Sequence, residues 1–354
     1  MSGWCSSPKR FARAIAAWQR EHGRHDLPWQ NTRDPYAIWV SEIMLQQTQV
    51  ATVIPYYERF MSSFPDVGAL ARAPLDDVLA HWSGLGYYSR ARNLHRAARV
   101  ICDAHRGRFP STFEGIAALP GIGRSTAAAI MVFAHGARLA ILDGNVKRVL
   151  SRACGIAGYP GDTPVADALW RAAERLLPRA RIEAYTQGLM DLGATLCLQR
   201  KPRCEVCPVS TGCVALREDR IEALPAPRPR KSLPHRRTVM LILQNSGELL
   251  LEKRPAPGIW GGLWCFPEIE AAENAAHACM ARFGARVGPV ERLPDIEHGF
   301  THFRLTISPH RLHVSSVIPR AGEAEQRWIR IDKVQEAAIP APVRRILAFV
   351  NGER

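Results

Sequence analysis

Four of the nine cysteines lie in one short stretch of the chain: Cys197, Cys204, Cys207 and Cys213. Four thiolates on one loop can surround a metal centre, and the dense group would oxidise if it were left unligated. The gaps of six, two and five residues are typical of a cubane iron-sulfur cluster. A four-cysteine zinc site usually uses paired close spacings, so the sequence favours one 4Fe-4S cluster and leaves zinc as the alternative.

A second pattern offers a place for a phosphate group. Gly121 and Gly123 are separated by one residue, which permits a tight hairpin, and a helix of small residues is expected from 127 to 134. Backbone N–H groups at the start of that helix, together with the helix dipole, favour an anion. Taken alone, the two glycines predict no more than a turn.

Two polar residues, Asp143 and Asn145, stand just before the next expected helix. The simplest interpretation of Asp143 is a helix N-cap. The order of hairpin, aspartate and four-cysteine loop resembles that of the helix-hairpin-helix DNA glycosylases. In that superfamily the hairpin holds the DNA backbone and the aspartate faces the sugar.

Three longer runs carry a closer resemblance: Leu-Pro-Trp-Gln at 27–30, the run at 41–50 and the run at 84–93. Together with the cysteine loop and the C-terminal part, they resemble the MutY-type adenine glycosylases over nearly the whole chain. Enzymes of the endonuclease III type share the hairpin, aspartate and cluster. They have no comparable second domain.

Adenine leaves poorly as an anion, so its ring must be protonated while the sugar gains positive charge. Glu42 is followed by three apolar residues, 43–45, and an apolar pocket would raise its pKa so that it can act as the acid. Asp143 is expected to stay ionised beside the sugar. The resemblance implies these roles: Glu42 protonates adenine N7 and then activates water, Asp143 stabilises the cation or bonds to it transiently, and Asn145 orients the groups around Asp143.

Extracting a base leaves a gap in the stack that a side chain must fill. The resemblance implies that Gln47 enters the stack and that Tyr87 lies beside the lesion on the opposite strand, with Thr48 and Leu85 nearby. Packing within the core is the alternative for Tyr87 and Leu85. Four basic residues suit contacts with phosphates: Arg90, Arg92, Lys147 and Arg148.

The residue type at position 125 bears on whether the enzyme also cuts the DNA strand. In relatives that also cut the strand, a lysine at this hairpin position attacks the sugar as an amine. A serine hydroxyl cannot form that Schiff base. We therefore predict a monofunctional glycosylase that leaves an abasic site.

The composition changes between residues 222 and 237, where four prolines alternate with arginine and lysine. This pattern predicts an extended basic linker. We place a helical domain at 1–217, the linker at 218–236 and a second domain at 237–354. Residues 238–243 and 248–252 flank Asn-Ser-Gly as a hairpin does, and Phe303, Leu305 and Ile307 alternate as in a half-buried strand.

This second part is similar to the Nudix-like domain with which MutY-type enzymes sense 8-oxoguanine opposite adenine. The family's sensing loop commonly reads Phe-Ser-His, and here the run is Phe300-Thr301-His302. A working Nudix hydrolase needs several glutamates on one helix to hold magnesium. No glutamate stands between Glu273 and Glu291, so hydrolysis is not expected.

The whole chain has 354 residues and a formal net charge of +14, which favours a polyanionic partner. Its helical spacing up to about Leu216 predicts a mostly α N-terminal region with an α+β Nudix-like domain behind it. No apolar run is long enough for a membrane span, no secretory signal is evident, and the remaining cysteines are scattered. We expect a monomeric cytoplasmic protein at the bacterial nucleoid that acts on adenine mispairs in duplex DNA and uses no nucleotide cofactor.

Two other functions stay open on the sequence alone. One is an endonuclease III-like glycosylase for oxidised pyrimidines, which the missing hairpin lysine and the second domain disfavour. The other is a non-catalytic DNA-binding iron-sulfur protein. The pair Glu42 and Asp143 speaks against it, because binding a polyanion needs neither carboxylate.

Overall fold

The computed structural model describes residues 3–229, 232–318 and 325–352. The chain forms two compact units. Unit 1 comprises Met1–Ala71 and Arg96–Arg230, and unit 2 comprises Arg72–His95 and Lys231–Arg354. Two residues of the predicted basic linker, Arg230 and Lys231, lie outside the described residues.

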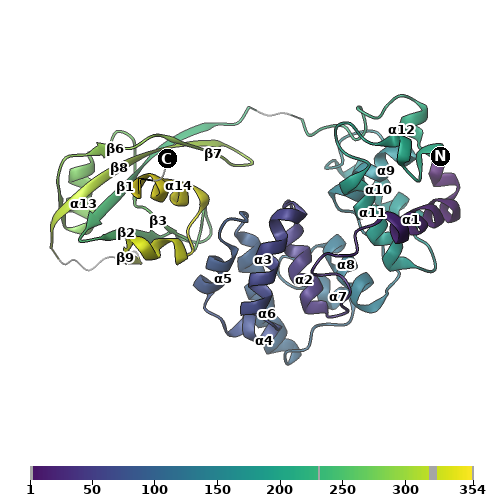
Figure 1. Ribbon diagram of the computed structural model, residues 1–354, viewed down its shortest axis with the longest axis horizontal. Helices are drawn as coiled ribbons and strands as arrows, with labels where there is room; N and C mark the ends of the chain where they lie inside the picture. The colour runs from purple at the N-terminus through teal and green to yellow at the C-terminus, as the bar shows by residue number, and fades with distance from the viewer. Residues whose placement is uncertain (1–2, 230–231, 319–324, 353–354) are drawn as a thin grey trace. The chain divides into compact units, whose positions relative to one another are not determined.

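Unit 1 is built from helices, as predicted for the N-terminal region. Figure 1 shows α1, α9, α10 and α11 packed together, and these four helices contact one another. The helices are α1 (Pro8–His22), α2 (Pro35–Leu45), α3 (Val50–Ser63), α4 (Val67–Arg72), α7 (Phe113–Ala117), α8 (Arg124–His135), α9 (Gly144–Cys154), α10 (Thr163–Leu176), α11 (Ile182–Thr195) and α12 (Val214–Arg217), with 3-10 turns η1 (Gly3–Ser6), η2 (Cys204–Val206) and η3 (Ser210–Gly212). Helix α6 (Ser89–His105) begins in unit 2 and continues into unit 1.

Local sequence explains how the helices that carry polar residues begin. The side chain of Asp34 accepts a hydrogen bond from the N–H of Tyr36, and Pro35 occupies the first position of α2. In the same way Asp143 caps α9 by accepting from the N–H of Val146 at 2.7 Å. Helix α3 buries Val53 and Tyr57, which lie four residues apart on one face of the helix.

One disulfide joins Cys5 and Cys154. The sequence showed the cysteines outside the cluster loop only as scattered, and it did not predict this pairing. The two residues are 149 positions apart in sequence. Packing of η1 beside α9 brings them together, and sequence spacing carries no trace of that contact.

Unit 2 contains a mixed sheet whose longest strands are β1 (His235–Asn245) and β8 (Arg304–Val317). These two run parallel and side by side (Figure 1), with His235 opposite Arg304. The main strand order is β3-β2-β1-β8-β5, while β4 pairs with β1, β6 and β7 pair with β8, and β9 pairs with β2. The shorter strands are β2 (Glu248–Lys253), β3 (Trp264–Cys265), β4 (Glu268–Ile269), β5 (Ala285–Val287), β6 (Glu291–Arg292), β7 (Ile296–Gly299) and β9 (Gln326–Arg330).

The predicted hairpin is present between β1 and β2. Asn245 pairs with Glu248, which leaves Ser246 and Gly247 as the two-residue turn. Both turn residues have positive φ, as a turn that matches the strand twist requires. Strand β1 begins three residues earlier than the predicted start at Thr238, because its parallel pairing with β8 extends the ladder to His235.

One helix of unit 2 packs on the sheet. Ala278, Cys279 and Phe283 of α13 (Ala275–Phe283) pack on Leu241 and Leu243 of β1. Helix α13 carries no acidic residue. Unit 2 also contains α5 (Leu75–Trp82), η4 (Ile331–Glu336) and α14 (Ala341–Val350).

None of the described helices combines the length and the apolar character that crossing a membrane requires.

Candidate functional site

A cleft of about 1570 Å³ opens in unit 1 and brings two predicted carboxyl groups to the same place. Glu42 reaches it from α2, and Asp143 reaches it from the start of α9, about one hundred residues later. Seven of the residues singled out in the sequence line this cleft: Glu42, Gln47, Thr48, Ser125, Asp143, Asn145 and Arg148. The helical fold therefore gathers residues from three separate sequence motifs.

Glu42 lies in surroundings that favour its neutral form. Burial, and to a smaller extent the neighbouring carboxylate of Asp143, raise the pKa of Glu42 to about 8. A pKa of about 8 keeps the proton on Glu42 at neutral pH. The site thus holds a carboxylic acid that can donate a proton.

Asp143 is in a more balanced environment. Burial raises its pKa above the ordinary value, whereas the N–H of Val146, the guanidinium of Arg148 and Asn145 lower it. We expected Asp143 to be ionised, but a raised pKa favours the protonated form of a carboxyl group. The two groups still differ. These partners favour the charged form of Asp143, whereas the neighbouring charge of Asp143 raises the pKa of Glu42 and so favours its neutral form. Of the two groups, Asp143 is the one whose hydrogen-bond and charge partners favour the ionised form.

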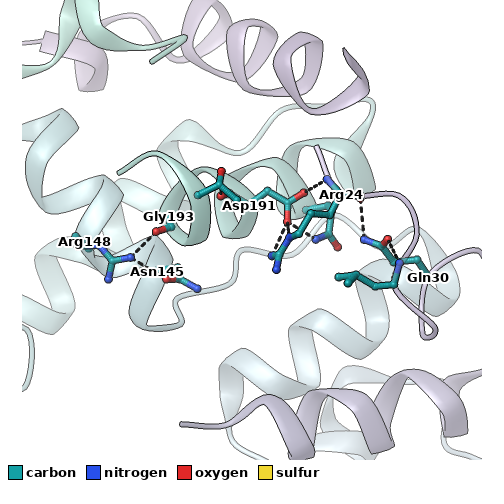
Figure 2. A network of polar contacts seen from close by, with 9 residues as sticks. Arg24, Gln30, Asn145, Arg148, Asp191 and Gly193 are labelled. Atoms are coloured by element: carbon teal, nitrogen blue, oxygen red, sulfur yellow. Dashed lines mark hydrogen bonds and ion pairs between the residues drawn. The ribbon is translucent and has the colours of Figure 1, made fainter. Parts of the chain in front are cut away.

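Arg148 connects Asn145 to the backbone of Gly193 (Figure 2) and also contacts the cysteine loop at Cys197. Its Nη2 donates to Asn145 Oδ1 at 2.8 Å and to the carbonyl of Gly193 at 2.6 Å, and its Nε donates to the carbonyl of Cys197 at 2.7 Å. We had assigned Arg148 to phosphates, but the structure gives its guanidinium three acceptors inside the protein. Its function is to fix Asn145 beside Asp143.

A buried ion pair that the sequence did not reveal forms another wall of the cleft. Asp191 of α11 is fully buried, and Arg24 binds it with its backbone N–H at 3.0 Å and its guanidinium at 2.6 Å. Gln187 donates to the same carboxylate, and Gln30 donates to the carbonyl of Arg24 (Figure 2). Gln30 belongs to a run that we quoted for its resemblance without assigning a role. Asp191 had no sequence signal, since a single aspartate in an amphipathic helix ordinarily faces solvent.

The hairpin lies where α8 begins. Gly121 adopts a positive φ of 79°, and both Gly121 and Gly123 are exposed, as an approach of DNA backbone would require. The hydroxyl of Ser125 accepts a hydrogen bond from the N–H of Leu142 at 3.0 Å, so it ties the hairpin to the segment that ends in Asp143. Lys147 is half-buried on α9 and does not line the cleft.

Gln47 stands at the mouth of the cleft on the turn after α2. Its side chain is exposed, and its backbone has a φ of 57°, which non-glycine residues adopt rarely. Such a conformation persists where the surrounding structure enforces it, and it is common at ligand sites. Thr48 is half-buried beside it, and its hydroxyl donates to the carbonyl of Gln46 at 3.4 Å.

The four cysteines of the loop surround one small cavity in unit 1. Burial raises the pKa of the thiols of Cys204, Cys207 and Cys213. The buried guanidinium of Arg152 lies 3.4 Å from Sγ of Cys197 and also donates to the carbonyl of Leu198. In the described part of the chain no three Cys, His, Asp or Glu side chains converge as ligands of a single ion do.

The remaining predicted residues belong to unit 2. Tyr87 is 46% exposed with a φ of 47°, whereas Leu85 is buried, so core packing applies to Leu85 alone. Arg90 is also buried, and it donates to the carbonyls of Leu85 and Gly86. Arg90 therefore stabilises this loop, which contradicts our assignment of Arg90 to phosphates.

Phe300, Thr301 and His302 form a tight turn between β7 and β8. The N–H of Phe300 donates to the carbonyl of Phe303 at 2.9 Å, and the two rings stack 4.4 Å apart. The side chains of Thr301 and His302 are exposed at the tip, where Thr301 Oγ1 lies 3.4 Å from His302 Nδ1. A hydroxyl held at the tip of a rigid turn is suited to contact a partner.

Family comparisons match both parts of the chain. The profile described as "HhH-GPD superfamily base excision DNA repair protein" matches residues 40–175, and the profile described as "NUDIX domain" matches residues 238–349. The chain is 37% identical over 338 residues to the adenine DNA glycosylase of Buchnera aphidicola subsp. Acyrthosiphon pisum (strain APS), covering 95% of this chain and 96% of that protein. It is 32% identical over 407 residues to the adenine DNA glycosylase of Homo sapiens, covering 97% of this chain and 74% of the human protein.

Among solved structures, a thermostable thymine-DNA glycosylase is similar, with 32% identity and a TM-score of 0.54 over 60% of this chain and 98% of that one. A trapped covalent intermediate of endonuclease III with DNA is similar in fold, at 19% identity and a TM-score of 0.52 over 60% of this chain and 98% of that one. The helical part is thus shared by proteins named for different bases. The fold of that part does not by itself select the base.

Proposed function

Because this chain belongs to the adenine DNA glycosylase family and excises adenine from DNA in base excision repair, we propose that its substrate is adenine paired with 8-oxoguanine or guanine in duplex DNA. The family decides against both alternatives, an enzyme for oxidised pyrimidines and a non-catalytic binding protein. The observation that carries the proposed mechanism is the shared cleft of Glu42 and Asp143, in which burial raises the pKa of Glu42 to about 8.

In this mechanism Glu42 donates its proton to N7 of the flipped adenine, which makes the base a neutral leaving group. The bond between the sugar and the base breaks with its electrons going to the base, and positive charge develops on the sugar. Asp143, held by the N–H of Val146 and flanked by Asn145, stabilises that charge. Glu42, now ionised, accepts a proton from the water that attacks the sugar carbon.

We propose that the reaction ends at an abasic site without strand cleavage. The hairpin position holds Ser125, and its hydroxyl is engaged with the N–H of Leu142. Strand cleavage by a lysine amine needs a Schiff base with the sugar, which a hydroxyl cannot form.

The proposed DNA contacts follow from exposure and backbone form. Exposed Gln47 at the cleft mouth suits insertion into the stack, with Thr48 beside it. Exposed Gly121 and Gly123 at the start of α8 suit a phosphate, and we also assign a phosphate contact to Lys147 on α9. On the opposite strand we assign the lesion contacts to Tyr87, Phe300, Thr301 and His302, whereas the buried Leu85 packs in the core of the loop that carries Tyr87.

We further propose that the cysteine loop holds one 4Fe-4S cluster, with Cys197, Cys204, Cys207 and Cys213 as its ligands. Their position around one cavity and the guanidinium of Arg152 near Cys197 support a buried, negatively charged group. When bound, the cluster would crosslink the loop and could supply an electron-transfer centre.

The domain limits, the monomeric state and the location at the nucleoid remain proposals. The domain limits of 1–217, 218–236 and 237–354 are kept, with the addition that residues 72–95 pack with the C-terminal domain. A monomer at the nucleoid suits an enzyme whose substrate is chromosomal DNA.

The test uses a duplex with one adenine opposite 8-oxoguanine, a second with adenine opposite guanine, and a third with adenine opposite thymine. Alkali-dependent cutting of the first two, absent for the third and absent before alkali, supports the proposed substrate and the monofunctional reaction. Cutting without alkali would overturn the monofunctional reaction, and equal cutting of all three would overturn the mispair.

A further inference from the structure

Residues 72–95 are fastened to the C-terminal domain within unit 2. The carboxylate of Asp76 pairs with Lys253 Nζ at 2.8 Å and accepts from Trp264 Nε1 at 3.4 Å. Ser83 Oγ donates to the carbonyl of Ile339 at 2.5 Å and accepts from Arg344 at 3.0 Å. The loop that carries Leu85 and Tyr87 is therefore bounded by contacts with that domain on its N-terminal side.

Arg92 makes the corresponding contact on the C-terminal side of the same loop. It stands on the first turn of α6, where its N–H donates to the carbonyl of Tyr88. Its Nη1 donates to the carbonyl of Gly261 at 2.6 Å, and it is half-buried. A charged donor on a neutral carbonyl in a partly dry place is a strong hydrogen bond. We had assigned Arg92 to phosphates, whereas its guanidinium is turned to the C-terminal domain.

The carbonyl that Arg92 binds follows directly on Trp260. Trp260 is buried and has a φ of 54°, a left-handed conformation that is costly for a bulky side chain and must be enforced by its surroundings. Its ring lies 5.7 Å from the ring of His298 and 5.5 Å from that of Phe300. Phe300 is the first residue of the sensing turn and precedes the exposed Thr301.

These contacts connect the two segments that are proposed to contact the lesion, the Tyr87 loop and the 300–302 turn. One chain of contacts runs from the Tyr87 loop through Arg92 to the peptide of Gly261. It continues through the ring of Trp260 to Phe300. Because Arg92 fixes the peptide next to a strained tryptophan, its loss would release the position of that ring.

We infer that Arg92 is a positioning residue for specificity: it holds the Tyr87 loop and the 300–302 turn as one preformed reader of the base opposite adenine. The inference rests on the proposed function, since it needs 8-oxoguanine to be distinguished from guanine. Arg92 contacts neither adenine nor the carboxyl pair in this arrangement, so the excision chemistry itself does not depend on it.

The test compares Arg92→Met, which keeps the length and removes the donors, with Arg92→Lys, which keeps one donor. Single-turnover excision is measured with adenine opposite 8-oxoguanine and opposite guanine. We expect Arg92→Met to reduce the preference for 8-oxoguanine by about tenfold, the worth of one charge-assisted hydrogen bond. Its rate opposite guanine should stay within about twofold, and Arg92→Lys should restore most of the preference. Trp260→Leu should lower the preference in the same direction.

The matched control is Lys333→Ala, which removes a cation of the same unit that pairs with Glu336 on the surface. An unchanged preference in Arg92→Met would overturn the inference, and so would equal losses on both duplexes. If Arg92 instead bound a phosphate, Arg92→Met would lower the affinity for both duplexes together, and the salt dependence of binding would become weaker. A wild-type enzyme that cuts both duplexes without a preference would overturn this inference and leave the proposed substrate standing, whereas a wild-type enzyme that cuts neither duplex would overturn the proposed substrate.

Discussion

The two units hold their functional residues in opposite ways. In the cleft of unit 1, polar groups are fixed by charged partners inside the protein, as Arg24 fixes Asp191 and Arg148 fixes Asn145. In the reader of unit 2, stacked rings support an exposed turn whose tip is Thr301. The difference follows from the task. Proton donation needs a low-dielectric place where a carboxyl group stays neutral, whereas reading a base needs an exposed and rigid surface.

The largest expected effect separates the two regions outright. Glu42→Gln removes the proton donor and should lower adenine excision by about 10²–10⁴-fold opposite every partner base. Duplex affinity should be nearly unchanged, because the reader is intact. Single-turnover rates and binding to a duplex with a non-cleavable adenine analogue measure the two quantities. A variant that keeps its rate would contradict the role of Glu42.

Arg148→Ala tests whether the cleft depends on its internal polar contacts. The change leaves the acceptors on Asn145, Gly193 and Cys197 without their donor, and we expect unfolding free energy to fall by about 2–4 kcal/mol. Excision should fall for both mispairs by the same factor. Thermal unfolding and rates with both duplexes provide the measurement, and a drop for only one mispair would contradict the separation of the two regions.

The pH dependence sharpens the comparison further. Excision needs the protonated form of Glu42, so its rate should fall as pH rises through about 8, while affinity for the mispair should not follow that curve. In Glu42→Gln this limb should be absent from the residual rate. The rate of the wild type relative to that of the variant is measured from pH 6 to pH 10, about two units on each side of 8. A flat profile over this range would contradict the raised pKa of Glu42.

The same group predicts how stability changes with pH. The pKa of Glu42 in the folded protein, about 8, lies above its ordinary value of 4.5, so the folded state binds more protons between these limits. Stability is therefore lost as pH rises from about 4.5 to about 8. Glu42→Gln should be more stable than the wild type at pH 8 and equal to it at pH 4. Denaturant unfolding at the two pH values checks the sign, and a variant that is less stable at pH 8 would refute it.

The smallest expected effect belongs to the reader. Thr301→Ala removes an exposed hydroxyl and should lower the preference for 8-oxoguanine by about threefold to tenfold, the worth of one hydrogen bond. The rate opposite guanine should not change. Thr301→Ser keeps the hydroxyl and serves as the control. Equal preference in all three proteins would place the lesion contact elsewhere.

The sequence by itself determined much of this protein. Motif order indicated the two carboxyl groups, the hairpin and the four cysteines, and apolar spacing indicated helices followed by a sheet domain. These features are local, since a cap, a turn or a ligand loop is encoded within a few residues. Thus Asp34 and Pro35 begin α2, and the Asn-Ser-Gly turn closes the hairpin.

Only the tertiary structure decided which polar residues meet. Three arginines that looked suited to phosphates, Arg90, Arg92 and Arg148, instead bind backbone carbonyls far along the chain or across a loop. Asp191 and the pair of Cys5 with Cys154 gave no signal for the same reason. The partner of a long charged side chain depends on which carbonyl or carboxylate folding brings near it, and residue type alone does not carry that information.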